Sequence, residues 1–179
     1  LICNTSGTNG VAVGCGALAS NTTGGNNVAV GKQSLTTNTI GAENVSVGNA
    51  SLCANTEGLN NTAIGHLALR QNTTASSNTA VGMSALTANT TGASNTAVGE
   101  VSLEANTTGR FNTAVGCGAL AANITGFRNV AVGLGSLASN TEGEYNIGLG
   151  KDAGEATTTG DYNTLLGSFA GFKNTTASN

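Results

Sequence analysis

The chain has 179 residues, of which 39% are hydrophobic, 3% aromatic and 8% charged, with 27 glycines, no proline, no tryptophan and a formal net charge of −3. So few large side chains do not fill a compact globular core, and without a basic patch we expect no nucleic-acid binding. No apolar run approaches the roughly 18 residues of a membrane span, so we expect no membrane contact within this segment.

A 17-residue unit recurs ten times without insertion or deletion. It begins at Gly10 and then at nine asparagines, from Asn27 to Asn163. Residues 4–7 match 21–24, the end of the first unit. We therefore expect one repeat array over 1–179, cut from a longer protein, in which 1–9 end a preceding unit and 10–179 form ten units. Such units stack on their neighbours and do not fold alone.

Numbered 1 to 17 from that asparagine, each unit predicts two short strands and a turn. Positions 1 to 4, as at 27–30, are β-branched or small and favour a first strand. Position 5 is glycine throughout, from Gly14 to Gly167, which suits a corner where a side chain would clash or φ must be positive. Positions 7 to 10 are expected to form a second strand, and positions 11 to 17, with Asn-Thr-Thr-Gly at their centre, to form the turn. The frequent glycines oppose helix. The prediction is an all-β fold, a parallel β-solenoid of ten 17-residue coils.

Charged residues fall only at positions 6, 7, 10, 11, 14, 16 and 17 of the unit. Because ionised side chains avoid uncompensated burial, the charge-free positions are interpreted as the inside. Neighbouring strand residues point to opposite faces. We expect Val or Ile at position 4 and Leu at position 9 to fill the coil, and the small residues at positions 3 and 8 to face another chain. The asparagines at positions 1 and 12 are expected to form amide ladders along the stack.

These units resemble the head repeats of trimeric autotransporter adhesins (YadA-like heads) and the related repeats of phage tail-fibre-like proteins. The matching core is Asn-Thr-Ala-Val-Gly, as at 78–82, 95–99 and 112–116, followed by an Asn-Thr-Thr-Gly turn. The last two units, 146–154 and 163–171, are similar to the tail-fibre variant, with Ala-Gly in place of Ala-Leu. The resemblance covers essentially the whole chain. It implies a left-handed β-roll with three chains around one axis, on a cell surface or a virion. Adhesin heads use a shorter unit, so this coil is expected to carry a longer outer loop.

No motif for chemistry is found in the sequence. Gly14-Cys15-Gly16 and three similar segments begin like a dinucleotide loop but lack the third glycine and a following helix. The single histidine, His66, lies at a charge-bearing outer position. The cysteines have no metal or redox spacing, and we expect free thiols, with interchain pairing as the alternative. They are Cys3, Cys15, Cys53 and Cys117. We therefore predict no catalytic, cofactor-binding or metal site, and a protein that is not an enzyme.

The predicted function is a non-catalytic structural or adhesive segment of an extracellular fibre, either a surface adhesin or a tail-fibre-like stalk. Expected partners are further copies of the chain, as a homotrimer or in end-to-end assembly, and a host-cell, matrix or glycan receptor. Two alternatives stay open: an ice-binding solenoid that uses the threonine rank at position 13, and a subunit of a self-assembling extracellular filament. Four aromatic residues point outward, to pack on neighbouring turns or to contact a ligand, and packing is favoured. They are Phe111, Phe127, Tyr145 and Tyr162.

Overall fold

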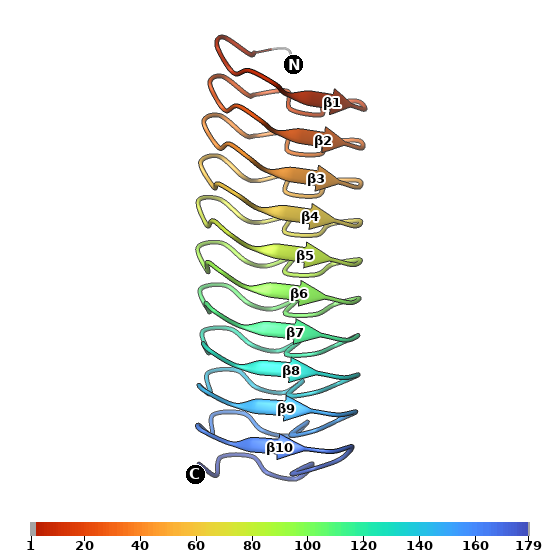
Figure 1. Ribbon diagram of the computed structural model, residues 1–179, viewed down its shortest axis with the longest axis vertical. Coiled ribbons are helices and arrows are strands. Elements are labelled where there is room, and N and C mark those ends of the chain that lie inside the picture. The colour runs from red at the N-terminus through yellow and green to blue at the C-terminus, as the bar shows by residue number, and fades with distance from the viewer. Residues whose placement is uncertain (1–2, 179) are drawn as a thin grey trace.

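The computed structural model describes residues 3–178, and these form a stack of ten three-residue strands with no helix (Figure 1). All ten strands belong to one parallel sheet in chain order, and each residue pairs with the residue 17 positions along the chain. The predicted parallel β-solenoid with a 17-residue coil is therefore confirmed. The strands are β1 (Val11–Val13), β2 (Val28–Val30), β3 (Val45–Val47), β4 (Thr62–Ile64), β5 (Thr79–Val81), β6 (Thr96–Val98), β7 (Thr113–Val115), β8 (Val130–Val132), β9 (Ile147–Leu149) and β10 (Thr164–Leu166).

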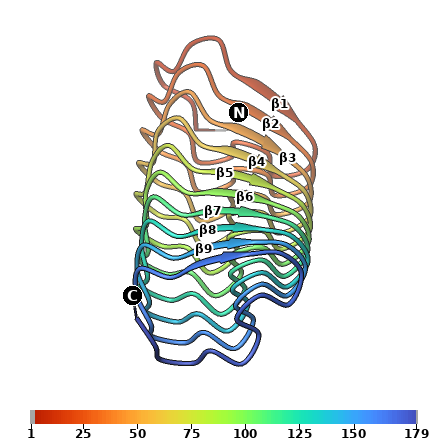
Figure 2. The same ribbon diagram turned by 60° about the horizontal axis from the view of Figure 1, so that its bottom comes forward.

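Backbone hydrogen bonds join neighbouring coils all around their circumference. On the strand side, Thr79 N donates to Asn95 O at 2.8 Å; on the opposite side, Leu86 N donates to Ser102 O at 3.0 Å. In the turn, three consecutive N–H groups converge on Thr107 O. The chain therefore winds continuously, with each coil lying on the one before it, as the tilted view shows (Figure 2). In a single coil these backbone N–H and C=O groups would have no partner. Each unit is therefore stabilised mainly by the coils on either side of it.

Positions 7 to 10 form consecutive turns, so the predicted second strand is wrong. Residues at positions 7 and 9 have a positive φ, for example 57° at Ser84 and 53° at Leu86. A leucine in this conformation costs roughly 1–2 kcal/mol. The turn, however, carries the Leu86 side chain into the coil, where it is fully buried, and full burial of a leucine contributes roughly 1.5–3 kcal/mol. Interior packing thus overrides the local preference of the leucine.

The two faces of each strand are also the reverse of the prediction. Ala97 at position 3 is 0% exposed inside the coil, whereas Val98 at position 4 is 37% exposed on the outside. The leucine at position 9 explains this, because it crosses the thin interior and leaves space only for a small residue opposite. Even a Cβ placed on Gly148 would lie 2.9 Å from Leu137 Cγ. The small residues at positions 3 and 8 therefore line the interior of a single chain and do not face another chain.

The glycine at position 5 meets both of the expected requirements. Gly82 has a φ of +136°, and a Cβ there would lie 2.5 Å from the carbonyl oxygen of Gly99 in the next coil. Any other residue would strain the backbone and push two coils apart.

The predicted amide ladder is confirmed at position 12, whereas at position 1 the side-chain oxygen accepts the backbone N–H of the asparagine in the next coil, as Asn78 Oδ1 does from Asn95 N at 2.9 Å. At position 12, Asn89 Nδ2 donates to Asn72 Oδ1 at 2.9 Å, and Asn89 Oδ1 accepts from Asn106 Nδ2 at 2.9 Å. At position 1, Asn95 Nδ2 donates to Gly109 O at 2.8 Å, and the same carbonyl accepts Asn106 Nδ2 at 3.0 Å. The Gly109 carbonyl therefore accepts from one asparagine at the start of the strand and from another in the turn, and these two bonds link the two segments inside the coil.

The position-12 ladder is interrupted at Thr157. Asn140 Oδ1 and Thr157 Oγ1 are both buried without a hydrogen-bond partner. We expect Thr157→Asn to raise the free energy of unfolding by about 1–3 kcal/mol, because the new amide can donate to Asn140 Oδ1. Denaturant unfolding measures the change. Thr159→Asn, at an exposed position of the same coil, is the matched control and should leave stability within about 0.5 kcal/mol. Equal midpoints for the two variants would contradict this interpretation of the ladder.

The Ala-Gly variant of the last two units has a packing reason. Position 9 is Gly154 and Gly171 there, while position 3 of β10 is Leu165. A Cβ on Gly154 would lie 2.5 Å from Leu165 Cδ1, and one on Gly171 would lie 2.6 Å from Leu165 Cδ2. The leucine that fills this end of the interior thus comes from the strand and not from the opposite turn.

Candidate functional site

The described residues offer interaction surfaces rather than an enclosed site. Among residues 3–178 there is no cavity and no group of three or more His, Cys, Asp or Glu side chains that could hold a metal. No helix in this part of the chain is long and apolar enough to cross a membrane. His66 is exposed, as its position in the unit predicted. All four cysteines are free; Cys3, Cys15 and Cys117 are exposed and Cys53 is half-buried.

The outward side of the ten-stranded sheet is the first surface. We call it the sheet face and define it as the side chains at positions 2 and 4 of every unit. The central part of this face consists of Thr-x-Val or Thr-x-Ile pairs, and valines predominate toward β1. Ten strands at ~4.8 Å spacing make it roughly 43 Å long. Its members are Val11, Val13, Val28, Val30, Val45, Val47, Thr62, Ile64, Thr79, Val81, Thr96, Val98, Thr113, Val115, Val130, Val132, Ile147, Leu149, Thr164 and Leu166.

The sheet face is free of charge although it is open to solvent in the single chain. Its side chains are half-buried or exposed; Val115 and Val132, for example, are 37% and 38% exposed. Burial inside the coil therefore cannot be the reason that charged residues avoid these positions. A long apolar surface of this kind is typical of an interaction site. Sequence reasoning missed it because the lack of charge at position 4 was interpreted as burial in the coil. Strand alternation, with the small residue at position 3 inside, was the signal that could have found it.

The threonines of the sheet face differ from those at position 13. Along position 13 the hydroxyls donate to the backbone of the next coil, as Thr90 Oγ1 does to Thr107 O at 3.1 Å. The position-2 hydroxyls of β4 to β7 make no hydrogen bond with another described residue, so they are free to bind water. They belong to Thr62, Thr79, Thr96 and Thr113. The threonine rank that water can use is therefore on the sheet face and not at position 13.

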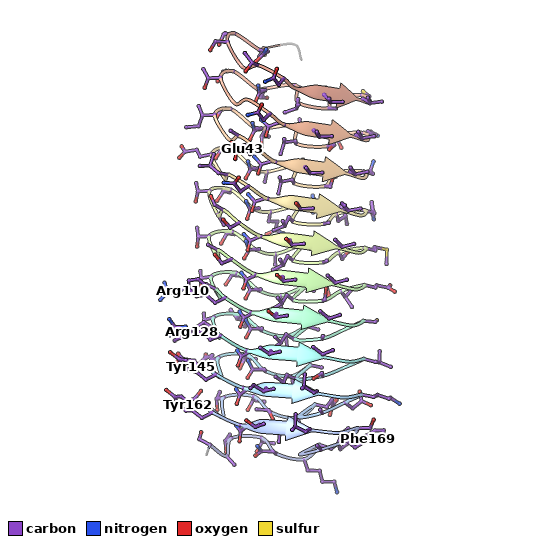
Figure 3. All side chains as sticks on the ribbon, viewed as in Figure 1. Glu43, Arg110, Arg128, Tyr145, Tyr162 and Phe169 are labelled. Atoms are coloured by element: carbon purple, nitrogen blue, oxygen red, sulfur yellow. The ribbon has the colours of Figure 1, made fainter. Side chains whose placement is uncertain are left out.

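The second surface is an edge of the stack where aromatic and arginine side chains follow one another. We call it the aromatic edge; Arg110, Arg128, Tyr145 and Tyr162 succeed one another along it in Figure 3. The rings of Tyr145 and Tyr162 are stacked, with centroids 4.9 Å apart. Phe127 meets Tyr145 edge to face at 5.6 Å.

Arginines are part of the same edge. The guanidinium carbon of Arg128 lies 5.7 Å from the ring centroid of Phe111 and 5.3 Å from that of Tyr145, and the Arg128 guanidinium donates to the Tyr145 hydroxyl. Arg110 lies over Phe127 at 5.7 Å. The aromatic edge consists of Arg110, Phe111, Phe127, Arg128, Tyr145 and Tyr162. Packing of these side chains on neighbouring turns is therefore confirmed, and it leaves Phe111 and Tyr162 exposed at 49% and 58%.

No protein-family model, curated protein or solved structure matches the chain. Because a fold alone does not determine function, what the chain does is inferred from the sheet face and the aromatic edge.

Proposed function

We propose that the chain is a non-catalytic structural segment of an extracellular fibre, a surface adhesin or a tail-fibre-like stalk, in which three copies pack side by side through the sheet face. The observation that carries the proposal is the composition of that face. All twenty outward strand positions hold Val, Ile, Leu or Thr, whereas charged residues are present on the loops of the same coils.

Covering the sheet face stabilises the assembly by removing apolar area from water, on the order of 1 kcal/mol for each partly exposed valine. The unbroken 17-residue register places equivalent residues of parallel copies at the same height, so every coil adds the same contact. Cyclic symmetry repeats one contact between all neighbouring copies and closes the assembly without open ends to the side. The resemblance to trimeric adhesin heads favours three copies.

In this arrangement the outer loops stay accessible, and they supply the adhesive role toward a host-cell, matrix or glycan receptor. The loops carry the variable and charged positions of the unit. A rigid stack that repeats one contact suits a stalk that holds such loops away from a surface.

Small-angle X-ray scattering tests the proposal, because the mass per unit length of a rod follows from its cross-section. We expect the mass per length of three chains side by side. A rod with the cross-section of one chain would reject the proposal.

An ice-binding role is the second candidate, favoured by the free hydroxyls of Thr62, Thr79, Thr96 and Thr113. Each presents a hydroxyl and a methyl group at the ~4.8 Å spacing of neighbouring strands, a regular array that can order water. If the sheet face binds ice, the purified chain shows a thermal hysteresis gap that Thr79→Lys removes. A freezing point equal to the melting point would exclude this role.

A further inference from the structure

The aromatic edge ends abruptly at the coil of Phe111. The two positions that form it, 16 and 17, carry bulky or charged side chains from Arg110 to Tyr162. In the five preceding coils the same two positions carry no aromatic ring and no arginine. The residues there are Gly25, Asn26, Ala42, Glu43, Leu59, Asn60, Ser76, Ser77, Ala93 and Ser94. The aromatic and arginine side chains of the edge therefore end between Phe111 and Ser94. We call this end of the aromatic edge the step.

This step leaves the Phe111 ring covered only in part. The Arg128 guanidinium approaches it from the following coil, while the preceding coil offers Ser94, whose side chain is too short to cover a ring. Phe111 is accordingly 49% exposed. Tyr145 and Tyr162 show that flat groups in successive coils at this position lie at stacking distance, 4.9 Å between centroids. A ring placed above Ser94 would thus continue the stack on Phe111.

The charge around the step is positive and has no internal partner. The one ion pair formed within residues 3–178 is Lys151 with Asp152, in a different part of the coil. Arg110 is exposed, lies over the Phe127 ring and forms no ion pair with a described residue. A guanidinium without a carboxylate partner is suited to bind a carboxylate or sulfate through two parallel hydrogen bonds. The nearest acidic residues at position 16 are Glu144 and Asp161, which precede Tyr145 and Tyr162 at the other end of the aromatic edge.

We propose that this step binds an acidic polysaccharide, with one sugar ring on the open face of Phe111 and its acidic group on Arg110. The hydroxyls of Ser94 and of Ser77 in the coil before it are placed to bond sugar hydroxyls. This inference rests on the proposed adhesive role and names the ligand class. A neutral sugar would leave the Arg110 guanidinium without an anionic partner.

The proposal is tested by measuring, with isothermal titration calorimetry, how the full chain binds three polymers. These are hyaluronan (carboxylate), heparin (sulfate) and dextran (neutral). We expect binding to at least one acidic polymer and none to dextran; which acidic polymer binds identifies the acidic group. Phe111→Leu and Arg110→Gln should each weaken binding roughly tenfold, since each removes one of the two contacts. Phe111→Tyr, which keeps the ring, should bind as the unchanged chain does.

Arg70→Gln and Phe169→Ala are the controls, since they remove an exposed arginine and an exposed ring at other positions of the unit. Both should leave binding unchanged.

Equal binding to dextran, no binding to either acidic polymer, or a loss with Arg110→Gln but not with Phe111→Leu would overturn the proposal. The mass of each variant in solution is measured in parallel. Failure of the assembly through the sheet face would change this mass, so it is distinguishable from failure of the sugar site.

Discussion

Val98→Glu is expected to separate the assembled copies into single chains. Val98 lies in β6, near the middle of the sheet face, and in a cyclic assembly every copy would bring a carboxylate into the same apolar contact. Each buried, unpaired charge costs several kcal/mol. This cost exceeds the free energy that the contacts of the neighbouring valines contribute to the assembly. The single chain should still fold, because Val98 is 37% exposed in it. Light scattering measures the mass, and circular dichroism checks the fold.

Thr108→Glu is the matched control for Val98→Glu. It introduces the same charge in the same coil, at an exposed outer position that is naturally glutamate in two other units, at Glu57 and Glu142. The mass of this variant should equal that of the unchanged chain. Persistence of the full assembly in Val98→Glu would show that the sheet face is not the contact between copies.

Asn89→Ala is expected to destabilise the coil by about 3–5 kcal/mol. The change removes the donor to Asn72 Oδ1 and Gly92 O and the acceptor of Asn106 Nδ2, all in the buried interior. The loss leaves Asn72 Oδ1 and one N–H of the Asn106 amide desolvated and unpaired, each at a cost of about 1–3 kcal/mol, whereas Gly92 O still accepts from Asn78 Nδ2. Hydrogen exchange of the amides of the adjoining coils would show the loss as local opening.

Asn49→Ala is the control for the ladder. Asn49 is exposed at position 6, so its replacement should change the unfolding free energy by less than about 0.5 kcal/mol. If both variants lose the same stability, the buried ladder is not the feature that holds the coils together.

The repeat period made much of the fold predictable. Because equivalent residues lie 17 positions apart, the parallel register, the glycine corner at Gly82 and the amide ladder at Asn89 all follow from the sequence. The turn at positions 7 to 10 did not follow, since leucine rarely adopts the positive φ of Leu86. That conformation is stabilised only by burial of the side chain between neighbouring coils.

The candidate surfaces were predictable only in part. Charge is absent both from positions that are buried inside the coil, such as Ala97, and from positions that are exposed on the sheet face, such as Val98. The sequence pattern alone does not separate them. The stacking of Tyr145 on Tyr162 does follow from their 17-residue spacing. The change of residue type before Phe111 can also be read from the sequence, whereas the contacts of Arg128 with the rings of Phe111 and Tyr145 are known only from the structure.

The mass of the unchanged chain in solution tests the central claim most directly, namely that the sheet face is covered by further copies. Light scattering over a dilution series should give a stable mass of three times the 17.4 kDa of one chain. A stable mass of 17.4 kDa at every concentration would contradict it, because the sheet face would then stay open to water.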